Sequence, residues 1–237
     1  MIKRIGSGMR CAAILATLSA SLLSISADAP SAPPHPGAAA VVDANAMLQL
    51  LVDGNRRFVE GHLRARDELP RRRELVNGQK PIAVIVSCSD SRVPPELVFD
   101  QDLGDVFVIR TAGEVVGDLE LGSIEYAVEH LGTPLIIVLG HQGCGAVTAA
   151  VKGGHAEGHI AAIVKAIEPA VKESKDEPGD AIDNAVRANV RDVARTLRAS
   201  DPILSHFVHD GKVKVVGGRY DLDSGKVELL PDDAAKP

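Results

Sequence analysis

Four short apolar runs, rich in β-branched residues, most constrain what this chain can fold into. Runs without polar alternation are typical of strands that are covered on both faces. Helical patterns separate them: one apolar stripe begins after Asp118, the expected N-cap, and stops at Gly132, and another occupies residues 182–197. Strands that alternate with helices predict a parallel sheet with helices on both faces. The predicted strands are 82–86, 106–109, 135–139 and 213–216.

Two further elements flank this core. Asp43 is expected to cap a helix over residues 44–62. Residues 227–230 follow an Asp-Ser-Gly turn, which predicts a closing hairpin strand. The arginine run at 71–73 is expected to be a solvated helix face. The fold class is therefore α/β, with a mostly parallel central sheet flanked by helices, a protruding N-terminal helix and an edge strand near the C-terminus.

The N-terminus has the pattern of a secretory signal. Three basic residues precede a mostly apolar stretch at 11–25, which is too short to span a membrane. Small residues at 27–29 favour cleavage after Ala29, with cleavage after Ser26 as the alternative. We expect a periplasmic or secreted protein without stable membrane insertion after cleavage. An amphipathic or anchoring N-terminal helix is the other interpretation of this segment.

The chain is expected to have three parts. The signal peptide occupies residues 1–29, and a disordered linker rich in Pro and Ala occupies 30–42. A single α/β domain fills 43–237. The formal net charge is −6 and no extended basic surface is evident, which argues against nucleic-acid binding.

Two of the predicted strands end in residues that carry chemistry. Cys88, Asp90 and Arg92 follow the first strand, and His141 and Cys144 follow the third. Because functional groups of parallel α/β sheets gather at the carboxyl ends of the strands, we expect these residues to converge if the strands are neighbours. Two thiolates, an imidazole and a carboxylate form a tetrahedral zinc set. The sequence therefore predicts a zinc site at this edge.

Glycines surround the His-x-x-Cys segment. Gly140, Gly143 and Gly145 are expected to let this turn come close to a metal. A disulfide between Cys88 and Cys144 is the alternative in an oxidising compartment. That alternative leaves the histidine, the aspartate and the glycines without a role.

The pattern Cys-x-Asp-x-Arg followed by His-x-x-Cys resembles the β-class carbonic anhydrases. The resemblance extends over most of residues 44–230 and includes Gly-Asn-Arg-Arg-Phe at 54–58. It implies zinc-dependent, reversible hydration of CO2 to bicarbonate and a proton, with one Zn²⁺ per chain. It also implies self-association as a homodimer or a higher even oligomer.

The resemblance assigns roles to the converging residues. Cys88, His141 and Cys144 would be permanent zinc ligands, and Asp90 with Arg92 would form a catalytic dyad that gates and orients a zinc-bound hydroxide. If the dyad breaks, Asp90 becomes a fourth ligand and closes the site. Two thiolates leave the zinc site formally uncharged, so its water is less acidic than at a three-histidine site. Activity is therefore expected to rise above pH about 7–8.

The resemblance also indicates substrate-binding residues. Gln79 matches a glutamine that reaches substrate across a dimer interface, and Gly145 matches a glycine whose backbone N–H faces substrate. The loop at 110–114 departs from the family pattern, so its contacts stay open. With no Trp in the chain, we expect the subtype without bicarbonate inhibition. The residues that match the apolar CO2 pocket are Phe107, Ala112 and Tyr126.

Two alternative functions stay open. One is a non-catalytic protein with a structural zinc, although structural sites are closed and usually lack a paired arginine such as Arg92. The other keeps the catalytic zinc but hydrolyses carbonyl sulfide or carbon disulfide. His155 and His159 are either proton shuttles or ordinary surface histidines.

Overall fold

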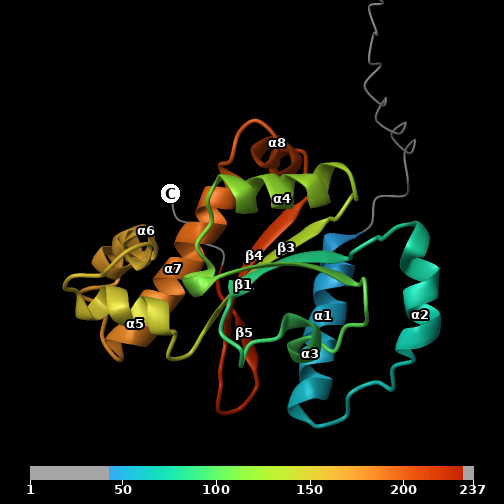
Figure 1. Cartoon of the computed structure of the whole chain (residues 1–237), viewed down its shortest axis with the longest axis horizontal. Helices are drawn as coiled ribbons and strands as arrows, with labels where there is room; N and C mark the ends of the chain where they lie inside the picture. The colour runs from blue at the N-terminus through green and yellow to red at the C-terminus, as the bar shows by residue number, and fades with distance from the viewer. Residues whose placement is uncertain (1–42, 232–237) are drawn as a thin grey trace, which may run out of the picture. The chain divides into compact units, whose positions relative to one another are not determined.

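The structure, a computed structural model, describes residues 43–231 (Figure 1). The predicted signal peptide and linker lie outside the described residues, as do residues 232–237 of the predicted domain. No helix in the described range has the length and apolar content to cross a membrane. In chain order the elements are α1 (Ala44–Val59), α2 (Glu68–Glu74), η1 (Leu75–Asn77), β1 (Ala83–Cys88), α3 (Pro95–Val98), β2 (Val106–Thr111), η2 (Ala112–Glu114), α4 (Asp118–Glu129), β3 (Leu135–His141), α5 (Gly145–Lys152), α6 (Ile160–Glu173), α7 (Ala181–Arg198), α8 (Leu204–His209), β4 (Lys214–Tyr220) and β5 (Val227–Leu229).

The sheet has the strand order β2-β1-β3-β4-β5. The strands from β2 to β4 pair in parallel, and β5 pairs antiparallel with β4. This confirms the predicted sheet and its edge strand. β1 and β3 are neighbours, and each continues beyond its apolar run to a residue of the predicted site: Cys88 ends β1 and His141 ends β3.

Alternate residues of each strand face opposite layers of helices. Val86 of β1 belongs to a core cluster with Ile124 of α4 and Val190 of α7. Ile85 belongs to a second cluster with Leu51 of α1. Figure 1 shows α4 and α7 on one side of the sheet and α1 and α3 on the other. Because both faces are covered, the strands appear in the sequence as continuous apolar runs.

Local capping sets where the helices begin. Asp43 accepts a hydrogen bond from the Asn45 backbone N–H at 2.9 Å, as expected for the N-cap of α1. At α4 the expectation was wrong, because Gly117 is the N-cap and Asp118 is the first helical residue. The backbone N–H of Gly117 donates to Glu120 Oε2 at 3.0 Å, which satisfies a donor at the start of the helix.

Ion pairs made by arginines connect the N-terminal segment to the rest of the fold. The fully buried Asp100 pairs with Arg57 at 2.6 Å, Arg64 at 3.3 Å and Arg66 at 3.2 Å. Burial alone would raise the pKa of Asp100, but hydrogen bonds and charge from the arginines lower it overall. Arg71 pairs at 3.0 Å with the aspartate that precedes β2, so the predicted solvated face does not include this arginine.

Gly140 lies in β3 where α7 packs against the sheet. A Cβ at this position would lie 2.5 Å from Val190 Cγ2 and 3.1 Å from Val186 Cγ1, both on α7. The glycine is therefore required for the close packing of α7, which corrects the expectation that it serves the approach to a metal. Gly143, with φ 61°, does supply the left-handed conformation of the turn before Cys144.

We expect Gly140→Ala to lower the free energy of unfolding by roughly 1–3 kcal/mol, because the added methyl group overpacks the contact with α7. Urea denaturation measures this change. Gly122→Ala is the matched control, since a Cβ at this exposed position of α4 would meet no atom within 4 Å. That control should be neutral or slightly stabilising. Equal destabilisation by both substitutions contradicts the packing argument.

Candidate metal centre

Cys88, His141 and Cys144 come together at the carboxyl ends of β1 and β3. Their ligand atoms all lie within 4.8 Å of one another, and the two Sγ atoms are 3.8 Å apart. All three side chains are buried, so the group is shielded from bulk water. Parallel pairing of β1 with β3 brings the ends of the two strands, and with them Cys88 and His141, to the same edge of the sheet, and the turn at 142–144 returns the second thiol to the same point.

The state of the histidine and cysteines fits a soft metal cation. His141 Nδ1 lies 2.9 Å from the Gln142 carbonyl oxygen, so it donates there and leaves Nε2 as the free lone pair. Nε2 is buried and has no hydrogen-bond partner in the structure. A role as a metal ligand accounts for a buried ring nitrogen that has no hydrogen-bond partner and lies beside two thiols. Both cysteines are free, so the structure does not contain the disulfide that the sequence left open.

The two sulfurs lie within hydrogen-bonding distance of each other. A hydrogen bond from the Cys144 thiol, opposed by burial, lowers the pKa of Cys88 to about 4. The same bond, together with burial, raises the pKa of Cys144 far above its ordinary value. For His141, burial lowers the pKa, but the nearby negative charges of Cys88 and Glu114 outweigh burial and raise it overall. Since metal ligands must be deprotonated, cation binding here would release protons.

Asp90 and Arg92 form a forked ion pair beside this group. Arg92 Nε donates to Asp90 Oδ1 at 2.9 Å, and Arg92 Nη2 donates to Oδ2 at 2.7 Å. The hydrogen bonds from Arg92 hold the pKa of the Asp90 carboxyl well below its usual range. Asp90 Oδ2 is 3.8 Å from His141 Nε2. The ionised and oriented carboxylate of Asp90 therefore lies directly beside the group of three candidate ligands.

Arg110 supports the segment that carries Cys88 and Asp90. Its Nε donates to the Cys88 carbonyl oxygen at 3.0 Å, and its Nη2 donates to the Asp90 carbonyl oxygen at 2.5 Å. The sequence prediction did not identify this role. The arginine lies in β2, at the start of the segment 110–114 whose departure from the family pattern left its contacts open. Its long-range hydrogen bonds depend on the pairing of β1 with β2.

Glu114 is a second residue that the sequence prediction missed. Its side chain is fully buried, and its backbone has φ 45°. Burial raises the pKa of Glu114 to about 8, although a hydrogen bond from Asn189 Nδ2 at 2.9 Å partly opposes this rise. The Oε2 atom has no hydrogen-bond partner in the structure. A buried carboxyl thus lies close enough to the metal group to interact electrostatically with Cys88 and His141.

The predicted substrate-binding residues are spread over the fold. Gln79 is exposed and lines an open cavity between η1 and β2 that contains no member of the metal group. Tyr126 is 49% exposed on α4, with its ring 5.2 Å from that of His130. Phe107 packs against the α4 side of the core, Ala112 begins η2, and Gly145 begins α5 directly after Cys144. His155 and His159 are exposed near the start of α6.

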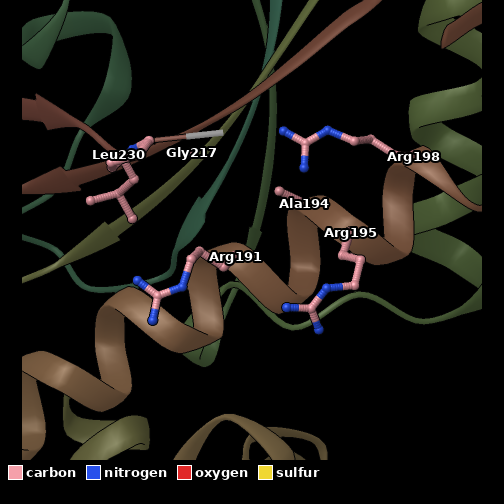
Figure 2. Close-up of a pocket in the computed structure, with 7 residues that line it drawn as sticks. Arg191, Ala194, Arg195, Arg198, Gly217 and Leu230 are labelled. Atoms are coloured by element: carbon pink, nitrogen blue, oxygen red, sulfur yellow. The ribbon is translucent and has the colours of Figure 1, made fainter. Parts of the chain in front are cut away.

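A separate cavity of about 200 Å³ lies between α7 and the last two strands (Figure 2). Three arginines of α7, Arg191, Arg195 and Arg198, line it together with Gly217 and Leu230. Arg195 pairs with two carboxylates, and Arg198 donates to a carbonyl oxygen of β4. The cavity contains no residue of the candidate metal centre.

Comparisons with known proteins agree with this geometry. The family model for carbonic anhydrase matches residues 83–227. Carbonic anhydrase 2 of Mycobacterium tuberculosis is 40% identical over 189 residues, which cover 78% of this chain and 91% of that protein.

Two solved structures share the fold. The β-carbonic anhydrase CcaA has a TM-score of 0.65 and 27% identity, with 80% of this chain and 97% of that chain covered. The Coccomyxa β-carbonic anhydrase, solved with acetazolamide, has a TM-score of 0.63 and 28% identity, with coverages of 77% and 86%. Since the family model spans more than half of the chain and a relative is 40% identical across most of it, this chain belongs to the β-class carbonic anhydrase family.

Proposed function

We propose that this chain catalyses the reversible hydration of CO2 to bicarbonate and a proton at a zinc ion held by Cys88, His141 and Cys144. The observation that carries the proposal is the presence of two features at one sheet edge. One is the buried soft ligand group, and the other is the Asp90 carboxylate that Arg92 holds 3.8 Å from His141 Nε2. Three protein ligands leave a coordination position open, which is typical of catalytic rather than structural zinc.

The residues of the site have distinct tasks. When bound, zinc would make water acidic enough to act as a nucleophile near neutral pH. The thiolates of Cys88 and Cys144 balance the charge of the dication, and His141 remains neutral. Asp90 accepts a hydrogen bond from the attacking water and directs its lone pair. Arg92 occupies both carboxylate oxygens of Asp90, which keeps that carboxylate from becoming a fourth ligand.

Activity is expected to rise with pH above about 7–8, because thiolate ligands make the metal less electron-withdrawing than three histidines do. Asp90 is not the source of this rise, since Arg92 keeps its pKa low and the carboxylate ionised across this range. Glu114, with a pKa of about 8, is the competing source. Stopped-flow rates should therefore show the same rise in Glu114→Gln as in the unmodified protein. A flat profile, or a rise that disappears in Glu114→Gln, contradicts this assignment.

The direct test is stopped-flow CO2 hydration by purified protein whose bound zinc has been quantified. We expect near-stoichiometric zinc and hydration well above the uncatalysed rate. Bound zinc without hydration would overturn the proposal and favour either a structural site or another substrate. Assays with carbon disulfide and carbonyl sulfide then separate these two alternatives.

We also propose self-association as a homodimer or a larger even oligomer. Gln79 lines its open cavity together with the exposed apolar side chains of Val76, 77% exposed, and Leu103, 45% exposed. Exposed apolar side chains grouped in this way are typical of an interface. Export to the periplasm or beyond is a further proposal, and it rests on the sequence pattern at 1–29 alone.

A further inference from the structure

We propose that Asn189 of α7 is a positioning residue for the metal centre, and that it acts through the η2 turn on the thiolate of Cys88. This inference rests on the proposed metal site and concerns a residue with no assigned role. Asn189 is 2% exposed and lies on the helix that packs across the carboxyl end of β3. It does not belong to the ligand group itself.

Three hydrogen bonds connect Asn189 to the ligand. Its Nδ2 donates to the Gly113 carbonyl oxygen at 2.8 Å and to Glu114 Oε1 at 2.9 Å. The backbone N–H of Gly113 in turn donates to Cys88 Sγ at 3.3 Å. All these contacts are buried, so each is strong in its surroundings and costly to lose.

The η2 turn contains a residue in an unfavourable backbone conformation, so contacts from outside the turn help to hold it. Gly113 has φ 70°, which is ordinary for glycine. Glu114 has φ 45°, a left-handed backbone conformation that residues other than glycine rarely adopt. A Cβ on Gly113 would lie 2.7 Å from Ile167 Cδ1, so the backbone is closely packed there. Asn189 bonds to both residues of this turn. It therefore contributes to fixing the backbone at Gly113, whose N–H points at Cys88 Sγ.

The direction of that N–H matters to a thiolate ligand. A hydrogen bond to sulfur stabilises its negative charge and fixes its orientation, and such outer contacts alter both metal affinity and the electronic properties of the bound metal. Loss of an outer hydrogen bond of this kind typically weakens metal binding by roughly 10- to 100-fold.

The chain offers a matched control on the same helix. Asn184 of α7 also donates its Nδ2 to two backbone carbonyl oxygens, those of Glu177 and Pro178. These bonds are exposed, and none of their partners contacts the ligand group. Asn184→Leu therefore removes the same chemical group and the same number of bonds without a connection to Cys88.

The experiment compares full-length Asn189→Leu and Asn189→Asp with Asn184→Leu and the unmodified protein. Zinc dissociation constants come from competition with a chelator, and Co²⁺-substituted samples report the thiolate-to-cobalt charge-transfer band. Circular dichroism of each metal-free sample identifies any variant that has not folded. Because Asp keeps the volume of Asn and removes the NH2 donor, it tests the hydrogen bonds if the leucine variant does not fold.

We expect the Asn189 variants to bind zinc roughly 10- to 100-fold more weakly and to shift the cobalt band, while Asn184→Leu stays within about twofold. Folded Asn189 variants with unchanged zinc affinity and an unchanged cobalt band would overturn the inference. These readouts do not require catalysis. If the unmodified protein binds zinc but does not hydrate CO2, the proposed function fails. The zinc affinities and the cobalt band still test the role of Asn189 in that case.

Discussion

Replacing His141 with alanine is expected to remove both bound zinc and CO2 hydration activity. The substitution takes away the one nitrogen ligand and leaves two sulfurs with a cavity in place of a fully buried ring. Enzymes typically accelerate a reaction at least about 10⁶-fold over its uncatalysed rate. Loss of the metal should therefore lower kcat/KM by at least about 1,000-fold. Metal analysis of the purified variant, followed by stopped-flow assay, measures both quantities.

The conditions of that experiment follow from the geometry. The thiols of Cys88 and Cys144 are 3.8 Å apart, so samples should be kept reduced to prevent a disulfide from producing the same loss. His130→Ala is the control, because this histidine is half exposed directly after α4 and lies outside the metal group. Retention of full zinc by His141→Ala would refute the proposed ligand set.

Arg92→Ala is expected to give a different result, in which zinc stays bound and activity falls. The ligand group does not include Arg92, so metal content should remain near that of the unmodified protein. Without the fork, Asp90 can turn toward the metal and close the open position. We expect a loss of kcat on the order of 10²- to 10³-fold, the usual effect of removing one oriented group from an active site.

Two further variants test the geometry of the pair. Arg92→Lys keeps the charge but cannot reach both carboxylate oxygens, so its activity should lie between those of Arg92→Ala and the unmodified protein. Arg195→Ala removes an arginine of similar exposure that pairs with carboxylates elsewhere. It should leave activity unchanged. Wild-type rates in Arg92→Ala would eliminate the proposed role of the pair.

The central sheet and the convergence of the three ligands could be predicted because they depend on short-range patterns. The β-branched runs identified β1 and β3, and strand ends in parallel sheets meet at one edge. Four helices were missed for physical reasons. α5 begins within the glycine-rich segment, α6 contains Pro169, and α3 and α8 are too short to show a periodic pattern.

The residues around the ligands could not be predicted in the same way. Glu114 and Asn189 are 75 positions apart and meet only because α7 crosses the sheet at Gly140. Gly140 lies beside a ligand in the sequence, and a glycine in that position does not indicate which neighbour requires it; the contact with α7 becomes visible only in the fold. The sequence carried one sign of Glu114, an acidic residue directly before the apolar pair 115–116. Its burial follows only from tertiary packing.

The strand order also determines when a metal ion can be captured during folding. His141 and Cys144 lie within a single turn, so this half of the site forms locally. Cys88 is 56 positions from Cys144 and joins them only when β1 pairs with β3, after the chain has crossed through β2 and α4. Such long-range closure is the slow part of folding. At the proposed site, a chain that has not completed the crossover would offer the ion only two of its three ligands and would release it readily. Retained metal would then indicate that β1 has paired correctly with β3.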